Sequence, residues 1–218
     1  ASTIDGLTVK NAQTGVMFAG TPAGTVKRCV IENNTIYGVR ANYASGAVIR
    51  NNRICNNGYG IRCSTSRIDA KNNMIYANSI RGISVDSAST ASSEIRNNTI
   101  VSCGVGIYVS ADSAAPQVGN CIFWDCTTQL ENCMVNYSCI DGGAAGIGNI
   151  ALNPVFIDEN NHDFRLSSQS PCFNIGNPSG DYSGESDFSG AARVQRGIVD
   201  IGAYEMSNVM RSMHFGDT

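Results

Sequence analysis

The sequence has little charge, no excess of positive charge and no long apolar run. Only 15% of its 218 residues are charged, and its 15 Lys and Arg against 18 Asp and Glu leave a formal net charge of −3. Nucleic-acid and anionic-membrane partners require a basic excess, so this balance argues against both. No apolar stretch approaches the roughly 18 residues of a membrane-spanning helix, and the first residues lack the features of an export signal. We therefore expect no nucleic-acid partner and no membrane span.

Turn-forming residues are abundant instead. The chain holds 23 Gly and an equal number of Asn, which tolerates turns and left-handed backbone better than most residues. So many turn formers, combined with 42% hydrophobic residues, favour many short strands joined by tight bends. A helical fold and a disordered chain are both excluded.

The nine cysteines include no CxxC pair of the kind that marks zinc or redox sites. Secreted proteins often pair their cysteines, but cysteine is also a small buried hydrophobe in stacked cores. The sequence leaves the redox state open, and it predicts no metal cluster.

A repeat governs the first part of the chain. Segments such as VIENNTI (30–36), VIRNNRI (48–54) and EIRNNTI (94–100) share one frame. The first aligned asparagines of the units are Asn11, Asn33, Asn51, Asn72, Asn97 and Asn120. A period of about 22 residues that tolerates insertions is typical of a β-solenoid.

A second short strand recurs in each unit, for example GIRC (60–63) and GISV (82–85). Alternation predicts two sets of positions on this strand. The inward set is Val16, Val39, Ile61, Ile83 and Ile107. The outward set is Met17, Arg40, Arg62, Ser84 and Tyr108. The strand that follows the asparagines is expected to send inward Ile36, Ile54, Ile75, Ile100 and Phe123.

The first asparagine of each unit lies between two strands, where a sharp bend favours a left-handed backbone. Amides stacked at this position can hydrogen-bond along the solenoid axis, as in other amide ladders. We therefore assign Asn11, Asn33, Asn51, Asn72, Asn97 and Asn120 to a structural ladder rather than to chemistry.

The repeat resembles the right-handed parallel β-helix of the pectate-lyase-like superfamily over about the first 125 residues. The remainder resembles the carboxy-terminal segment of bacterial β-helix proteins of the choice-of-anchor Q type. The matching text is DFRL (163–166), SPCFNIG (170–176), DFSGAAR (187–193) and DIGAYE (200–205). The resemblance implies a secreted or surface-located bacterial protein. It assigns no catalytic role, because this fold hosts lyases, binding domains and inert stalks.

We expect an all-β protein with three parts: a right-handed parallel β-helix of about six coils at 1–148, a capping segment at 149–205 and a short tail at 206–218. Asp187, Arg193 and Asp200 should form ion pairs that close the last coils. In the tail, the spacing of Met206, Val209, Met210 and Met213 predicts a short helix.

Two outward columns could contact an acidic polysaccharide. One precedes the asparagines and contains the cations Lys10, Arg50, Lys71 and Arg96. Its members, spaced by about 4.8 Å, could follow a row of carboxylates, although a solvated charged face is the more ordinary outcome. The other column has Arg40 and Arg62 on adjacent coils. Nearby positions of the same face or its loops are Tyr43, Tyr108, Asp86 and Asp112.

The second column also suits a lyase. A β-eliminating enzyme needs a base near the sugar proton and a cation that neutralises the uronate, so Arg40 or Arg62 would be the base. Calcium is the cofactor such a site would use, but Asp86, Asp112 and Asp69 fall on separate coils, too sparse for a firm calcium site. Whether the protein is an enzyme stays open.

Three functions follow from these patterns. The first is an extracellular module that binds acidic polysaccharide, and the second is a pectate-lyase-like lyase. The third is a structural solenoid that stacks end to end, because the chain opens within a strand pattern and would expose an unpaired coil.

Overall fold

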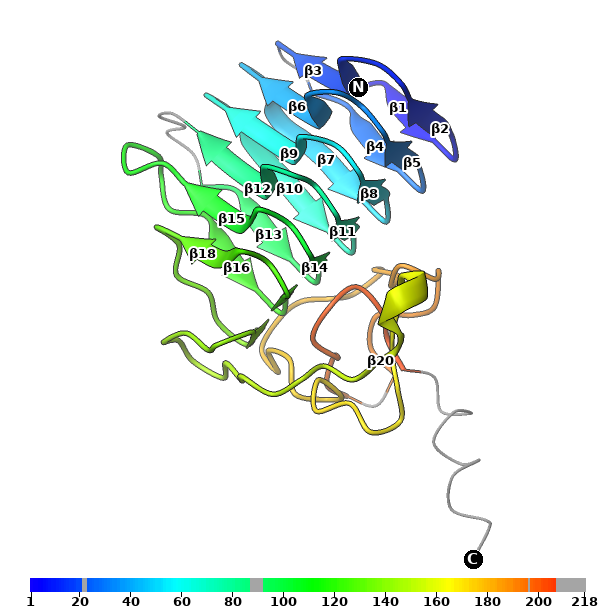
Figure 1. Cartoon of the computed structure of the whole chain (residues 1–218), viewed down its shortest axis with the longest axis vertical. Helices are drawn as coiled ribbons and strands as arrows, with labels where there is room; N and C mark the ends of the chain where they lie inside the picture. Colours follow the sequence, from blue (N-terminus) through cyan, green and yellow to red (C-terminus); the bar gives the residue numbers. More distant parts are fainter. Residues whose placement is uncertain (21–22, 87–91, 196, 207–218) are drawn as a thin grey trace, which may run out of the picture.

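The computed structural model describes residues 1–20, 23–86, 92–195 and 197–206. In these residues the chain winds through three parallel sheets, so that each coil adds one strand to each sheet (Figure 1). The fold is the predicted all-β solenoid. Among the described residues the single helical turn is the 3₁₀ turn η1 (Glu159–Asn161).

The three sheets differ in strand length but share the same stacking order. Sheet A contains β1 (Thr3–Asp5), β4 (Thr25–Lys27), β7 (Ser45–Arg50), β10 (Arg67–Lys71), β13 (Glu94–Arg96) and β16 (Gln117–Gly119). Sheet B contains β2 (Thr8–Lys10), β5 (Val30–Glu32), β8 (Arg53–Cys55), β11 (Met74–Tyr76), β14 (Thr99–Val101), β17 (Ile122–Trp124) and β19 (Cys139–Ile140). Sheet C contains β3 (Thr14–Ala19), β6 (Tyr37–Asn42), β9 (Tyr59–Ser64), β12 (Arg81–Asp86), β15 (Val105–Val109) and β18 (Thr128–Glu131). Two sheets of six strands and one of seven agree with about six coils.

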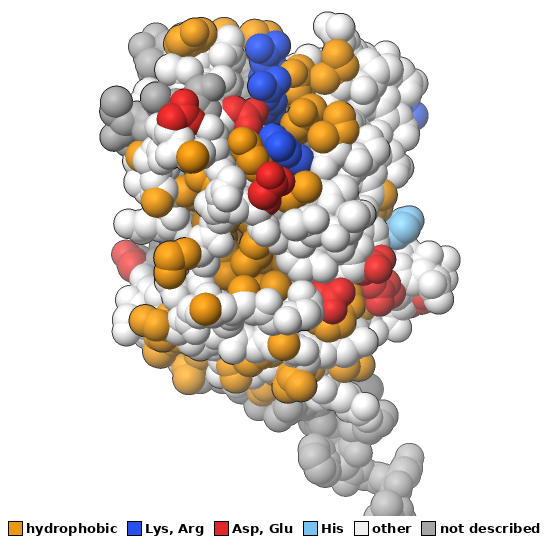
Figure 2. All heavy atoms as spheres, turned by 60° about the vertical axis from the view of Figure 1, so that its left-hand side comes forward, with side chains coloured by type: hydrophobic (Ala, Val, Ile, Leu, Met, Phe, Trp, Pro, Cys, Tyr) orange, Lys and Arg blue, Asp and Glu red, His pale blue; other side chains and the backbone are white. Residues whose placement is uncertain are grey.

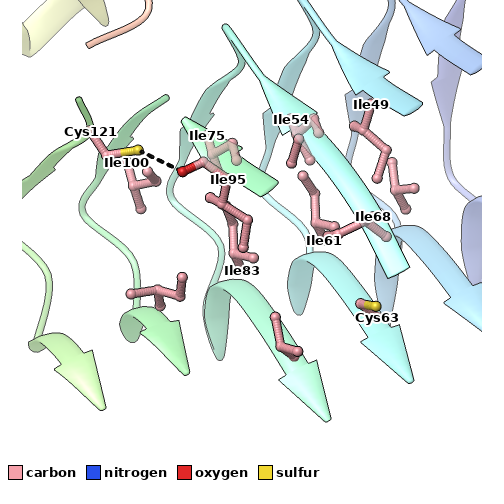
Figure 3. Close-up of a cluster of buried hydrophobic side chains, with 14 of the residues drawn as sticks. Ile49, Ile54, Ile61, Cys63, Ile68, Ile75, Ile83, Ile95, Ile100 and Cys121 are labelled. Carbon is pink, nitrogen blue, oxygen red and sulfur yellow. Dashed lines mark hydrogen bonds between the residues drawn. The ribbon is translucent and has the colours of Figure 1, made fainter. Parts of the chain in front are cut away.

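Isoleucine columns fill the interior between the sheets. Ile61 and Ile83 of sheet C face Ile54, Ile75 and related residues of the other sheets, all fully buried (Figure 3). The inward positions predicted for sheet C are confirmed, because all five are at most 3% exposed. β-Branched side chains suit this role, since they pack well on a pleated surface and have few rotamers to lose.

One predicted inward residue is wrong. Ile36 is half-buried and precedes β6, whereas Ile31 pairs with Ile54 in sheet B and fills the core position. The sequence alignment of the repeats therefore matched the wrong corner of the second coil with the corners of the later coils. The asparagine pair at 33–34 stands opposite the pair at 56–57, not the pair at 51–52.

Two corners of the coil turn through a left-handed residue. At the corner between sheets A and B these residues are Gly6, Arg28, Asn51, Asn72, Asn97, Asn120 and Tyr137. At the corner between sheets B and C they are Asn11, Asn33, Asn56, Ala77, Ser102 and Asp125. The predicted backbone conformation is thus confirmed for all six asparagines, but they divide between two corners.

The hydrogen-bonded ladder runs through the residue after each left-handed one, which corrects the expected ladder. Between sheets A and B, the backbone N–H of Asn52 donates to Oδ1 of Asn73 at 3.0 Å, and that of Asn73 donates to Oδ1 of Asn98 at 3.0 Å. By contrast, Oδ1 of Asn72 and both amide atoms of Asn97 have no hydrogen-bond partner. The left-handed residue turns its side chain outward, so only its neighbour can reach the next coil.

Cysteines continue both ladders where asparagine is missing. Cys29 precedes Asn52 in the first ladder, and Sγ of Cys121 accepts the N–H of Asn98 at 3.5 Å. Between sheets B and C, the N–H of Cys103 donates to Sγ of Cys126 at 3.4 Å. All nine cysteines are free in the structure, and eight are buried.

The carboxy-terminal segment covers the outer face of sheet B. It includes the antiparallel hairpin of β20 (Phe156–Asp158) and β21 (Asp163–Leu166). Phe164 packs against the outward side chain of Tyr76, and Ala203 donates its N–H to Thr99 Oγ1 at 2.9 Å. Figure 1 shows this segment, yellow to red, beside the lower coils. The predicted tail helix falls on residues of which all but Met206 lie outside the described chain.

Candidate functional site

The outer face of sheet C carries two rows of large polar side chains on adjacent coils. One row contains Arg40 opposite Arg62, followed by Ser84 and Tyr108. The other row contains Tyr37, Tyr59 and Arg81. Strand pairing fixes both rows, because parallel partners in register stack at the strand spacing. Figure 2 shows a row of Lys and Arg side chains on this side of the molecule, among side chains of the hydrophobic class, to which tyrosine belongs.

The arginines of this face lie over tyrosine rings. The guanidinium of Arg81 is 3.5 Å from the ring centre of Tyr108, and that of Arg40 is 5.1 Å from the ring centre of Tyr37. Arg62 lies 5.4 Å from the Tyr37 ring and 5.5 Å from the Tyr59 ring. These contacts hold the long cations against the sheet with little freedom, since arginine stacks favourably on aromatic faces.

Asp86 neutralises two of the three arginines. Its carboxylate accepts a hydrogen bond from Nε of Arg62 at 2.5 Å and lies 3.5 Å from Nη1 of Arg81. Nη1 of Arg62 also donates to the Tyr37 hydroxyl at 2.5 Å. Burial lowers the pKa of Arg62, but the Asp86 carboxylate and the Tyr37 hydroxyl outweigh it, so the net shift is upward. Arg62 is therefore held as a cation.

Arg40 has no acidic partner among the described residues. Its Nε is buried and makes no hydrogen bond, while the side chain as a whole is half-buried beside Tyr37. In the described part of this face, Arg40 is the cation whose charge no carboxylate matches.

The remaining residues predicted for this face are dispersed. Tyr43 is 67% exposed and sits with left-handed backbone at the corner between sheets C and A. Asp112 is exposed in the loop after β15 and accepts a hydrogen bond from the Ser110 hydroxyl. In the described part of the chain, no three His, Cys, Asp or Glu side chains form a group that could hold a metal ion.

The predicted basic column is divided between two sheets. Lys10 pairs with Glu32 in sheet B, whereas Arg50, Lys71 and Arg96 stack in sheet A. The slipped alignment of the second coil explains this error. On the amino-terminal side, the neighbour of Arg50 is Lys27, which the asparagine spacing did not reveal.

Acidic side chains occupy one end of the sheet-A column. Nζ of Lys71 lies 2.9 Å from Glu94 and 3.3 Å from Asp69, and Nε of Arg96 donates to Glu94 at 2.8 Å. Arg96 also pairs with Glu185, which comes from the carboxy-terminal segment. These two cations therefore serve to dock that segment.

The carboxy-terminal segment contains a buried charge network that differs from the predicted one. Arg193 is fully buried, and its acidic partner is Glu205 at 3.3 Å. Nη2 of Arg193 also donates to the backbone carbonyls of Asp200 and Gly202 at 2.7 Å. The carboxylates of Asp187 and Asp200 instead accept backbone N–H groups, for example that of Met206 at 2.7 Å.

The ionisation of this network is shifted by burial. Desolvation raises the pKa of Glu205 to about 8, although the Arg193 charge acts in the opposite direction. Burial likewise lowers the pKa of Arg193 despite its acidic neighbours. This network is distant in the sequence from the outward rows of sheet C. It stabilises the docked segment, and it is buried too deeply to contact a polymer.

Sequence reasoning missed Tyr37, Tyr59 and Arg81 on the sheet-C face. Each precedes the recurring glycine of its strand, so the signal was present in the repeat. A Cβ at Gly38 would lie 2.7 Å from the carbonyl oxygen of Gly60, and the same close approach recurs along the column. The glycine interrupts strict alternation, which is why the residue before it also points outward.

A family model described as "Right handed beta helix region" matches residues 1–123. Among solved structures, the crystal structure of pectate lyase Pel9A is similar, with a TM-score of 0.56 and 15% sequence identity. The match covers 94% of this chain and 65% of that chain, so this chain spans less than two thirds of the lyase. No curated protein matches. In the described residues, no helix is long and apolar enough to cross a membrane.

Proposed function

The chain belongs to the right-handed β-helix family, and from this premise we propose that it binds an acidic polysaccharide along the outer face of sheet C. The observation that carries the proposal is Arg40, a cation without a carboxylate partner in the described residues, on a face lined by tyrosines. A guanidinium matches the geometry of a uronate carboxylate, and tyrosine rings offer apolar surface to the sugar ring.

The spacing of the rows supports a polymer as the ligand. Arg40 and Arg62 repeat at the strand spacing, so the face extends along the solenoid axis as a chain of sugars would. Asp86 forms ion pairs with Arg62 and Arg81, which hold both side chains in place. Because the surface is ordered before binding, the entropic cost of association is lower.

Binding is favoured over β-elimination. A lyase base must give up its proton at working pH, yet the upward pKa shift of Arg62 holds its proton more tightly. Arg40 stays the candidate base of the lyase alternative. The likeness to pectate lyase Pel9A supports a polysaccharide ligand through its fold only, because the two chains are 15% identical.

Location outside a bacterial cell is part of this proposal. It rests on the resemblance of the carboxy-terminal segment to the choice-of-anchor Q type. The glycan of a cell wall or of a biofilm would then be within reach of the sheet-C face.

Affinity electrophoresis in gels containing polygalacturonate tests the proposal. The unmodified protein should be retarded, and added salt should relieve the retardation because it screens exposed charges. Arg40→Gln should lose at least about tenfold in affinity, whereas Arg165→Gln, an equal charge change on the carboxy-terminal hairpin, should not.

The same samples distinguish the alternatives. Ultraviolet absorbance, measured with calcium present, detects the release of unsaturated uronides. If the unmodified protein releases them and Arg40→Gln does not, the protein is a lyase and the binding proposal is replaced. Equal retardation of both variants and of the unmodified protein would overturn the role of the sheet-C face. Light scattering at the same concentrations reports whether the chains stack end to end.

A further inference from the structure

A cavity of about 480 Å³ lies between sheet A and the loop at 184–190, and none of its lining residues belongs to sheet C. Strands β4, β7 and β10 form its floor, and residues of the loop form its roof. Its charged and amide side chains include Lys27, Arg50, Asp69, Lys71, Asn72 and Glu185.

A hydrogen bond and an ion pair attach the loop at 184–190 to the solenoid. Nδ2 of Asn51 donates to the carbonyl of Asp187 at 2.5 Å, and Arg96 pairs with Glu185. The cavity is thus formed by the fold itself and does not depend on a ligand to close it.

The charges on the floor are not balanced. Lys27, Arg50 and Lys71 stand directly opposite one another on adjacent strands, an arrangement that repels. Ion pairs reduce the repulsion at two of these cations: Nζ of Lys27 lies 3.4 Å from the Asp5 carboxylate, and Nζ of Lys71 lies 2.9 Å from the Glu94 carboxylate. Arg50, between them, lines the cavity, is exposed and has no acidic partner within the described residues.

Unpartnered acceptors lie beside this cation. Asn72 is 3% exposed, and its Oδ1 makes no hydrogen bond. Oε2 of Glu185 is also buried without a partner. Buried acceptors of this kind are normally satisfied, so they indicate a missing donor.

We propose that this cavity binds a uronic acid monosaccharide. The carboxylate would form paired hydrogen bonds with the Arg50 guanidinium, and the sugar hydroxyls would donate to Asn72 Oδ1 and Glu185 Oε2. A cavity of about 480 Å³ is of the size that encloses small polar ligands. This site is separate from the sheet-C face and does not depend on polymer binding there.

Titration calorimetry with galacturonate and the full chain tests the site. We expect saturable binding with one ligand per chain. Arg50→Gln should weaken it at least about tenfold, because the unmatched cation is lost. Asn72→Gly should also weaken it, and this variant keeps the fold because glycine adopts the left-handed backbone found at Asn72.

Controls separate this site from the proposed function. Arg165→Gln, an equal charge change outside both sites, should bind galacturonate as the unmodified protein does, and Arg50→Gln should still be retarded by polygalacturonate. Galactose, which lacks the carboxylate, and inorganic phosphate, which lacks the sugar, should each bind at least about tenfold more weakly than galacturonate. Tighter binding of phosphate would identify a simple anion site and overturn the proposal. Absence of saturation by galacturonate, or equal weakening by Arg165→Gln and Arg50→Gln, would overturn it as well.

Discussion

Replacing Asn73 by alanine removes the central rung of the ladder between sheets A and B. Its Oδ1 accepts the backbone N–H and the side-chain Nδ2 of Asn52, both at 3.0 Å. Its Nδ2 donates to the carbonyl of Ile49 at 2.8 Å and to Oδ1 of Asn98 at 3.0 Å. All four bonds lie in a fully buried corner.

The cost follows from the groups left without partners. Nδ2 of Asn52 keeps the Val26 carbonyl, and Oδ1 of Asn98 keeps the N–H of residue 73. The N–H of Asn52 loses its side-chain acceptor, and the Ile49 carbonyl loses its side-chain donor. At about 1–3 kcal/mol for each such group, Asn73→Ala should lower the free energy of unfolding by about 2–6 kcal/mol.

Urea denaturation followed by circular dichroism measures this loss. The matched control is Asn72→Gly, because Asn72 makes no ladder bond and glycine tolerates its φ of 55°. That variant should change the free energy of unfolding by less than about 1 kcal/mol. Asn73→Cys should recover part of the loss, since Cys29 and Cys121 already occupy this column. Equal destabilisation by Asn72→Gly and Asn73→Ala would refute the assignment of the ladder.

The sequence was sufficient for the fold because the repeat encodes it locally. Alternation in GIRC and GISV placed Ile61 and Ile83 in the core, and the asparagine bends were correctly given left-handed backbone. Within the solenoid, the strands of each coil pair only with those of the neighbouring coils, so no long-range information was needed to stack them.

The register of the second coil could not be fixed from asparagine spacing alone. In the third coil both corners carry an Asn-Asn pair, at 51–52 and at 56–57, so Asn33 was matched with Asn51 although it stands opposite Asn56. The step of 18 residues between Asn33 and Asn51, against a period of about 22, was the sign of this slip. It placed Lys10 in the wrong sheet and hid Lys27.

The cavity on sheet A was beyond sequence reasoning for a different reason. Its roof comes from a segment more than 100 residues after its floor, and no periodicity relates Glu185 to Lys71 or Arg96. Only the docking of the carboxy-terminal segment brings these charges together.

Three further measurements test the packing and the buried charges. Ellman's reagent should modify at most one thiol rapidly in the folded protein and all nine after denaturation, since eight are buried and burial raises the pKa of Cys133 to about 12; rapid reaction of several thiols would contradict the burial. Phe164→Ala should cost about 3–5 kcal/mol and make the carboxy-terminal segment sensitive to protease, because Phe164 is 2% exposed between Tyr76 and Phe156. The pKa of Glu205 rises on folding from 4.5 to about 8, so its contribution to stability is complete below pH 4.5 and lost as the pH rises toward 8. This loss, at most on the order of 5 kcal/mol, should disappear in Glu205→Gln, and an unchanged pH profile of the unfolding free energy in that variant would show that Glu205 is ionised in the folded protein throughout this range.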